Sequence, residues 1–327
     1  MILVTGGAGY IGSHTVLALN EAGARTLVLD NFSRGHRDTC FGSQTVEGDL
    51  RDQALLKRIF LENPIEAVIH FAAHSQVGES MNSPETYYEN NIGGSLNLLR
   101  AMREAGVKDL VFSSSASVYG EPEAVPIEEN ARLSPTSVYG ETKLMTEKML
   151  TAYCRAYGFR AAALRYFNAA GCDPQGRTGE DHTPETHLIP LVLDVALGKR
   201  DRISVFGSDY HTPDGTCIRD YVHVTDLAAA HVLALEKLRR SPAGFRFSCN
   251  LGSGAGYSVQ EILKAAREVT GAPIPAVVTG RRPGDPAILI ASSELAVKEL
   301  GWKPCYASIG QIVATAWAWH KKRFAGA

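Results

Sequence analysis

A glycine-rich turn directly after an apolar strand is the feature that most constrains the fold of this chain. Residues 1–5 (Met-Ile-Leu-Val-Thr) form an apolar run of strand length, and Gly6, Gly9 and Gly12 follow at intervals of three. Glycines at this spacing allow a tight turn, a close approach of the backbone to a pyrophosphate, and close packing of the next helix on the sheet. We therefore expect that helix, which starts near Tyr10, to bind the phosphates of a dinucleotide at its N-terminus.

An acidic residue further along the chain supports the dinucleotide interpretation. Asp30 follows the strand-like run 26–29, about twenty residues after the glycines, where an acid recognises ribose hydroxyls. Its carboxylate would repel a 2′-phosphate, which favours NAD over NADP, although Arg34 and Arg37 nearby weaken that preference. The alternative is that Asp30 is only a turn residue at the end of a strand.

More apolar strands alternate with helical stretches along the first half of the chain. Strands are expected over 44–48, 67–71, 109–112 and 161–166, and helices between them include 53–61 and 86–104. This alternation predicts an α/β fold, a doubly wound parallel sheet of the Rossmann type with helices on both faces. Ligands bind beyond the C-terminal ends of the strands in such sheets, so the polar residues that end these strands should meet in one crevice.

A tyrosine and a lysine in the middle of the chain indicate acid–base chemistry. Tyr139 and Lys143 are four residues apart in a helix expected from about 136 to 157, so both side chains lie on one face. A free tyrosine has a pKa of about 10, but a neighbouring ammonium stabilises the phenolate, which can then accept a hydroxyl proton. Ser115 ends a strand that leads to the same crevice, where its hydroxyl can relay that proton. These residues predict that a nicotinamide cofactor takes a hydride from a carbinol while Tyr139 takes its proton.

Several motifs resemble the extended short-chain dehydrogenase/reductase superfamily and, within it, the UDP-glucose 4-epimerase family. The resemblance rests on Thr5–Gly12, Ser113–Gly120, Tyr139–Lys143, Arg165–Asn168, Gly179–Asp181, Arg219–His223 and Arg281–Asp285. These motifs follow the family's order along nearly the whole chain. The resemblance implies an isomerase that transfers hydride from C4 of a UDP-sugar to tightly bound NAD. The 4-keto sugar then rotates and takes the hydride back on its other face, which interconverts UDP-glucose and UDP-galactose.

The resemblance, together with the glycine motif, implies three sets of site residues. The catalytic set is Ser115, Tyr139 and Lys143. The residues expected to line NAD are Gly6, Gly9, Tyr10, Ile11, Gly12, Asp30, Asn31, Asp49, Leu50, Phe71, Ala72, Ala73, Asn90, Ser113, Tyr139, Lys143 and Phe167. The residues expected to hold the UDP-sugar are Asn168, His187, Leu188, Phe206, Arg219, Arg282, Asp285 and Leu289. Two arginines suit a diphosphate, and an aspartate suits ribose hydroxyls.

Three places in the sequence need comment. The family often has a lysine near the cofactor phosphates where this chain has Ser75, and Asn-Asn-Leu where it has Thr186–Leu188, so His187 replaces one polar substrate contact. Counting from Asp285 places Leu289 where the family has the residue that abuts the C2 substituent of the sugar. Leucine is intermediate in size, which predicts UDP-glucose and UDP-galactose as the main pair and weak turnover of the N-acetylated pair. The alternative is that Leu289 is an apolar core residue.

Other functions on the same scaffold fit the sequence less well. A UDP-N-acetylglucosamine 4-epimerase remains an alternative, because only the residue that abuts the C2 substituent of the sugar distinguishes it from a UDP-glucose 4-epimerase. A 4,6-dehydratase needs an acid pair directly after position 115, where this chain has Ala116 and Ser117. A non-catalytic NAD-sensing protein would have no need of Ser115, Tyr139 and Lys143 together.

Composition excludes several classes of partner. The hydrophobic content is 45% and the net charge is −2, so no basic excess points to nucleic acid. No apolar run reaches membrane-spanning length, and Met1 leads straight into the first strand, so we expect a cytoplasmic protein without a signal peptide. The six cysteines have no paired spacing and the ten histidines form no metal motif, which favours reduced thiols and no metal.

A loop-rich stretch after Asn168 predicts the domain boundary. Residues 1–168 are expected to form the NAD-binding Rossmann domain, and 169–327 a smaller C-terminal α/β domain that binds the UDP-sugar. Some elements of the second part could return to the large sheet. The long helices expected over 86–104 and 136–157 carry more apolar surface than one face of a sheet needs, which predicts a homodimer that forms through them. The alternative is that this surface packs within the chain.

Overall fold

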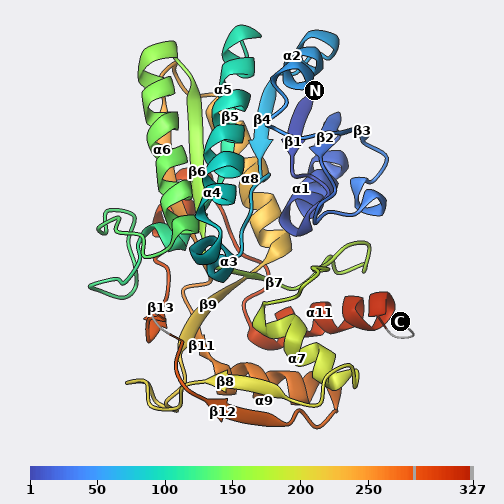
Figure 1. Cartoon of the computed structure of the whole chain (residues 1–327), viewed down its shortest axis with the longest axis vertical. Helices are drawn as coiled ribbons and strands as arrows, with labels where there is room; N and C mark the ends of the chain where they lie inside the picture. The colour runs from blue at the N-terminus through green and yellow to red at the C-terminus, as the bar shows by residue number, and fades with distance from the viewer. Residues whose placement is uncertain (283–284, 325–327) are drawn as a thin grey trace.

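The computed structural model describes residues 1–282 and 285–324 and contains one large parallel sheet (Figure 1). Its seven strands run in the order β10-β6-β5-β4-β1-β2-β3. The strands are β1 (Ile2–Thr5), β2 (Thr26–Asp30), β3 (Gln44–Glu47), β4 (Ala67–His70), β5 (Asp109–Ser115), β6 (Arg160–Tyr166) and β10 (Arg246–Leu251). Every pairing in this sheet is parallel, which confirms the doubly wound α/β fold predicted from the sequence.

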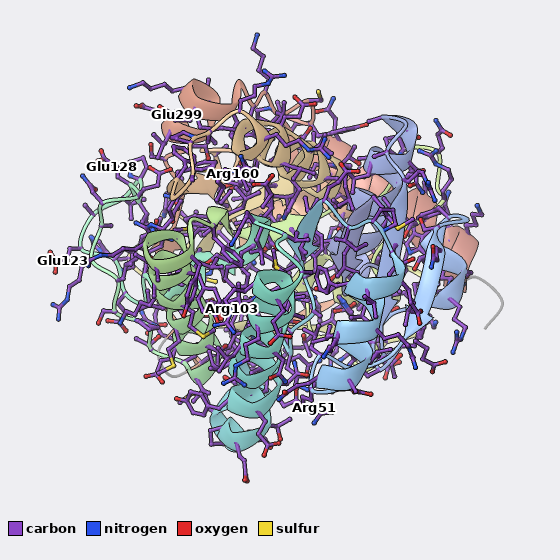
Figure 2. The ribbon with its side chains drawn as sticks, turned by 90° about the horizontal axis from the view of Figure 1, so that it is seen from above. Arg51, Arg103, Glu123, Glu128, Arg160 and Glu299 are labelled. Atoms are coloured by element: carbon purple, nitrogen blue, oxygen red, sulfur yellow. The ribbon has the colours of Figure 1, made fainter. Side chains whose placement is uncertain are left out.

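Helices cover both faces of the large sheet. On one face lie α1 (Tyr10–Glu21) and α8 (Val224–Arg239), which share a buried apolar cluster with β1 and β6. On the other lie α2 (Gln53–Glu62), α5 (Gly94–Glu104) and α6 (Val138–Tyr157), whose apolar side chains form a second cluster. Seen from above, α5 and α6 run side by side along their face of the sheet (Figure 2). Because both faces are covered, all residues of β1, β2 and β4 are buried, which explains their continuous apolar sequence.

A smaller α/β part lies beyond the C-terminal ends of the large sheet (Figure 1). Its strands are β7 (Asn168–Ala170), β8 (Ile203–Phe206), β9 (Ile218–His223), β11 (Gly256–Ser258), β12 (Ala276–Thr279) and β13 (Ile288–Leu289). Its helices α7 (Leu188–Ala196), α9 (Val259–Thr270) and α11 (Ile309–Phe324) contribute to a third apolar cluster. Pro283 and Gly284, inside one of the motifs noted above, and residues 325–327 lie outside the described residues.

The chain returns to the large sheet after the expected boundary at residue 168. Strand β10 pairs with β6 over its full length, from Arg246 opposite Ala161 to Leu251 opposite Tyr166. Helix α8 packs against α1, and α10 (Glu294–Leu300) packs against β10 and α8. The second half of the sequence therefore builds part of both units.

The helix expected over 86–104 is present without a break but contains a π-helical segment. The structure has α3 (Val77–Asn82), α4 (Pro84–Tyr87), a π-helical segment (Tyr88–Gly93) and then α5. The buried side chain of Asn91 accepts from His74 N at 2.8 Å and donates to His74 O and Thr142 Oγ1 at 3.0 Å each. The wider π turn accommodates these contacts, and such turns are common at functional sites.

No helix in the described part of the chain is both long enough and apolar enough to cross a lipid bilayer.

Candidate active site

The glycine turn between β1 and α1 has the geometry that phosphate binding requires. Gly6 has φ +71°, and a Cβ on Gly12 would lie 2.2 Å from the carbonyl oxygen of Gly6, so neither position tolerates a side chain without distortion. Helix α1 begins at Tyr10, right after this turn, with no side-chain cap and no acidic residue in its first turn. An uncapped helix N-terminus with no acidic residue in its own first turn is suited to bind an anion.

Asp30 lies at the C-terminal end of β2 and fixes the glycine turn. Its carboxylate accepts hydrogen bonds from Ala8 N at 3.0 Å and Phe32 N at 2.9 Å. Burial raises the pKa of Asp30, and the two backbone amides partly offset that shift. The carboxylate is therefore held rigidly at the edge of the predicted cofactor site, where an acid can accept hydrogen bonds from ribose hydroxyls.

The two arginines that could favour a 2′-phosphate are engaged elsewhere. Arg34 donates to the carbonyl oxygen of Thr183. Arg37 pairs with Glu47, and its guanidinium lies 4.2 Å from the ring centroid of Phe32. These contacts remove the objection that the sequence raised against NAD.

The ends of β2 and β3 are joined through Asp49. Asn31 donates to Asp49 at 3.0 Å, and Arg51 donates to both carboxylate oxygens at 2.8 Å and 2.9 Å. The hydrogen bonds from Arg51 hold the pKa of Asp49 well below its usual range. Sequence reasoning missed Arg51, which orients an expected cofactor contact. Leu50 is buried and packs against Gly94 on α5.

The residues that follow β4 lie in contact with the glycine turn. Phe71 N and Ala72 N both donate to Thr5 O, at 2.9 Å and 3.0 Å. A Cβ on Gly6 would meet Ala72 N at 2.5 Å, so the two loops are in close contact. Ala73 follows directly, and Asn90, on the π-helical segment, donates to Asn91 Oδ1 at 3.0 Å. The expected cofactor contacts of β1, β2 and β4 thus lie along one edge of the sheet.

The tyrosine and lysine that the sequence predicts to be catalytic lie on the first turns of α6. Ser137 caps this helix by accepting from Gly140 N at 3.1 Å, which fixes the start of the helix next to Tyr139. Lys143 Nζ lies 5.6 Å from the ring centroid of Tyr139 and donates to Ser113 O, at the end of β5, at 2.6 Å. The hydrogen bond to β5 holds the buried ammonium in place.

Burial dominates the electrostatics of this pair. Burial raises the pKa of Tyr139, and a hydrogen bond with Ser115 opposes the shift. Burial also lowers the pKa of Lys143 to about 7. Ser115, at the end of β5, accepts from Ser117 N at 3.1 Å, which orients its hydroxyl. The structure therefore brings all three predicted catalytic residues together.

A buried ion pair between Glu147 and Arg165 connects α6 to β6. Glu147 is four residues after Lys143 and accepts from Ser114 Oγ at 2.6 Å and from Arg165 at 2.9 Å and 2.6 Å. Both charged side chains are almost completely buried, with relative exposures of 5% for Arg165 and 3% for Glu147. Sequence reasoning missed this pair although it contained two signals: an arginine inside an apolar strand, and an acid at helical spacing from Tyr139 and Lys143.

The residues expected to bind the nucleotide of the substrate meet around β9 and β13. Arg219 on β9 forms an ion pair with Asp285, and Leu289 on β13 lies opposite Arg219 in the register of the two strands. The guanidinium of Arg282 lies 3.9 Å from the ring centroid of Phe206, at the end of β8. The ion pair with Arg219 gives Asp285 a partner that sequence reasoning did not predict.

Phe167 and Leu289 pack against one small apolar cluster, although they are far apart in the sequence. Asn168 begins β7, opposite Tyr221, and Leu188 begins α7. His187 directs its Nδ1 atom at Glu180 Oε1, 2.7 Å away, and at Glu185 Oε1, 3.1 Å away. Its ring therefore contacts acidic side chains of the same loop, and the sequence did not predict these contacts.

The similarity to known proteins extends over nearly the whole chain. The model of the NAD dependent epimerase/dehydratase family matches residues 2–250. A UDP-glucose 4-epimerase from Halalkalibacterium halodurans is 56% identical over 321 residues, which cover 98% of this chain and 96% of the relative. The crystal structure of UDP-glucose 4-epimerase from Brucella ovis in complex with NAD aligns with a TM-score of 0.94 at 47% identity, over 97% of both chains. That of UDP-glucose 4-epimerase from Bifidobacterium longum in complex with NAD+ and UDP aligns with a TM-score of 0.93 at 40% identity, over 98% of both. The chain therefore belongs to the NAD dependent epimerase/dehydratase family and, within it, to the UDP-glucose 4-epimerases.

Proposed function

We propose that the protein interconverts UDP-glucose and UDP-galactose by removing and returning the hydride at C4 of the sugar. The observation that carries this proposal is the grouping of Tyr139, Lys143 and Ser115 at the same C-terminal edge of the sheet as the glycine turn. Bound NAD would accept the hydride from C4 and return it to the other face of the 4-keto sugar. Separate incubation with UDP-galactose and UDP-N-acetylgalactosamine, followed by chromatographic resolution of the products, tests it.

Tyr139 is the group that we assign to the proton. Its hydroxyl is the acid–base group of the predicted pair, and a hydrogen bond with Ser115 opposes the rise in its pKa that burial causes. In its ammonium form Lys143 adds a positive charge 5.6 Å from the centroid of the phenol ring, and the cationic nicotinamide of the oxidised cofactor would add another. These charges favour the phenolate, which takes the C4 hydroxyl proton and gives it back when the hydride returns.

Arg219 and Arg282 are the groups that we assign to the diphosphate of the substrate. Arg219 is fixed by Asp285, while Arg282 is exposed and stacked on Phe206. A guanidinium can bind two phosphate oxygens at once, so these side chains can hold the nucleotide while the sugar rotates. No residue with the acid function of a dehydratase follows Ser115, since Ala116 and Ser117 occupy those positions.

Protein purified without added cofactor should contain close to one equivalent of NAD(H) per chain, which only denaturation releases. The reaction cycle regenerates the cofactor, so nothing requires it to exchange. Added NADP should not replace it, because the rigid carboxylate of Asp30 would repel a 2′-phosphate. Cofactor content is measured by absorbance and chromatography after denaturation. Activity that appears only when NADP is supplied would contradict this assignment.

The size of residue 289 should decide the sugar range. Leu289 is half-buried and packs against the same cluster as Phe167, so a larger or smaller side chain changes the space beside an expected nicotinamide contact. Leu289→Tyr should abolish weak turnover of N-acetylated UDP-sugars and spare the main pair. Leu289→Ala should raise that turnover about tenfold, the lower range for a change of this size in a pocket.

Steady-state kcat/KM for both substrate pairs measures the effect of each Leu289 variant. Thermal denaturation serves as the control for folding, because Leu289 also contacts apolar core residues. If kcat/KM changes equally for the two substrate pairs, or if only the stability falls, Leu289 is a core residue and another residue limits the size of the C2 substituent.

We also propose a homodimer that forms through α5 and α6, which lie side by side on one face of the molecule (Figure 2). Packing within the chain already uses Leu98, Leu99 and Leu150, so the apolar surface left for a partner is smaller than the sequence suggested. Met145 is 43% exposed on α6 and remains available.

A further inference from the structure

Two histidines and two glutamates converge in the loop before α7. His187 Nδ1 lies 2.7 Å from Glu180 Oε1 and 3.1 Å from Glu185 Oε1. His182 Nδ1 lies 3.4 Å from Glu180 Oε1 and 3.6 Å from Glu185 Oε2. One ligand atom from each of the four residues lies within 4.8 Å of all the others. We refer to these four residues as the loop cluster.

These separations match those of a tetrahedral zinc site. Zinc binds histidine nitrogen and carboxylate oxygen at about 2.0–2.2 Å, so adjacent ligands around a tetrahedral ion are about 3.3 Å apart. The four distances from a histidine Nδ1 to a glutamate oxygen range from 2.7 Å to 3.6 Å, and one ligand atom of each residue lies within 4.8 Å of the other three. Small rotations of the side chains would equalise them around one ion.

The hydrogen bonding of the loop cluster is incomplete without a cation. His182 Nδ1 is fully buried and has no hydrogen-bond partner of acceptable geometry among the residues that the structure describes. The side chain of Glu180 is only 8% exposed and faces both histidines. A buried polar atom without a partner costs free energy, and a metal ion would give His182 Nδ1 a partner while it pairs with both carboxylates.

The rest of the protein positions these ligands. Glu185 Oε1 accepts from the backbone amides of Thr186 at 2.7 Å and His187 at 2.8 Å. The carbonyl oxygen of Glu180 accepts from Trp319 Nε1 on α11 at 3.1 Å. The ring of Tyr10, at the start of α1, lies 6.2 Å from that of His182. Outer contacts of this kind orient metal ligands and raise metal affinity.

We propose that the loop cluster, His182 and His187 with Glu180 and Glu185, binds one Zn2+ ion as a structural site. Four protein ligands fill a tetrahedral shell, which is typical of structural rather than catalytic zinc. Two imidazoles select a transition metal over Mg2+ or Ca2+, which prefer oxygen ligands. All four ligands come from the loop before α7, so the ion would cross-link residues 180–187 within that loop.

The test uses the NAD-loaded full-length protein, treated with a chelator and then titrated with Zn2+ or Co2+. Calorimetry and elemental analysis should give one Zn2+ per chain at micromolar protein concentration, and Co2+ should give the absorption spectrum of a tetrahedral site. Mg2+ at the same concentration should not bind. A wild-type protein that takes up no stoichiometric Zn2+, or a Co2+ spectrum of an octahedral site, would overturn the proposal.

Variants locate the site. His182→Gln and Glu185→Gln should each weaken Zn2+ binding by more than the 10- to 100-fold that loss of an outer-shell partner costs. His36→Gln is the matched control. His36 contacts the same loop, with its Nε2 atom 3.2 Å from Asp181 Oδ2, but it does not belong to the loop cluster. Zn2+ affinity that is unchanged in both ligand variants, or that falls as much in His36→Gln, would show that the ion binds elsewhere. Should one ligand variant fail to fold, the other variant and the Co2+ spectrum of the wild type decide.

Discussion

Tyr139→Phe should lower the rate of epimerisation by about 10²–10⁴-fold, the usual cost of losing a general base. The substitution removes one oxygen atom from a half-buried ring whose packing in the first turn of α6 is otherwise kept. Cofactor content and thermal stability should therefore change little. The rate is measured with UDP-galactose at saturating concentration. Turnover near that of the wild type in a folded variant would rule out Tyr139 as the base.

Two further variants sharpen this result. Lys143→Ala removes the ammonium that favours the phenolate, so the pKa of Tyr139 should rise and the activity profile should move to higher pH. Tyr157→Phe is the matched control, since Tyr157 ends the same helix and is 43% exposed, far from Ser115. It should leave both the rate and its pH dependence unchanged.

Glu147→Leu should reduce the free energy of unfolding by about 3–5 kcal/mol, the usual cost of removing one partner of a buried ion pair. The substitution leaves the guanidinium of Arg165, 5% exposed, without its carboxylate partner, and leaves Ser114 Oγ without its acceptor. Leucine is similar in volume to glutamate, so loss of the charge and not a cavity accounts for the effect. Chemical denaturation of the NAD-loaded protein measures it.

The double variant Glu147→Leu/Arg165→Leu separates the charge effect from packing. Removing both charges leaves no unpaired ion in the interior, so the double variant should be more stable than either single variant. If the two single effects simply add, the ion pair contributes no coupling energy and this explanation is wrong.

The strands of the large sheet could be predicted because their apolar runs are short, continuous and ended by glycine or polar residues. The expected strand 161–166 differs from β6 by one residue at its start. The expected strand 109–112 is too short, because β5 continues through Ser113, Ser114 and Ser115. Those serines are buried and bonded to groups of α6 and β6, which a polarity pattern alone does not reveal.

Contacts between distant loops could not be predicted from periodicity. The sequence placed His187 with the substrate contacts, but the fold surrounds its ring with Glu180, His182 and Glu185. Loops have no regular spacing, so nothing in residues 171–187 indicated which side chains would meet. Glu147 is different, because its spacing from Lys143 was visible and only its partner on β6 was not.

The return of β10 to the large sheet determines how the chain can be divided. A fragment that stopped at residue 168 would leave β6 as an unprotected edge, with unpaired backbone groups ready to associate with other chains. It would also lack α8, which covers one face of the sheet beside α1. The smaller part is thus built from two segments, one before β10 with β7, α7, β8 and β9, and one after it with β11, α9, β12, β13 and α11. Such an architecture allows substrate recognition to diversify in both segments, while the nucleotide-binding framework must be inherited and truncated only as a whole.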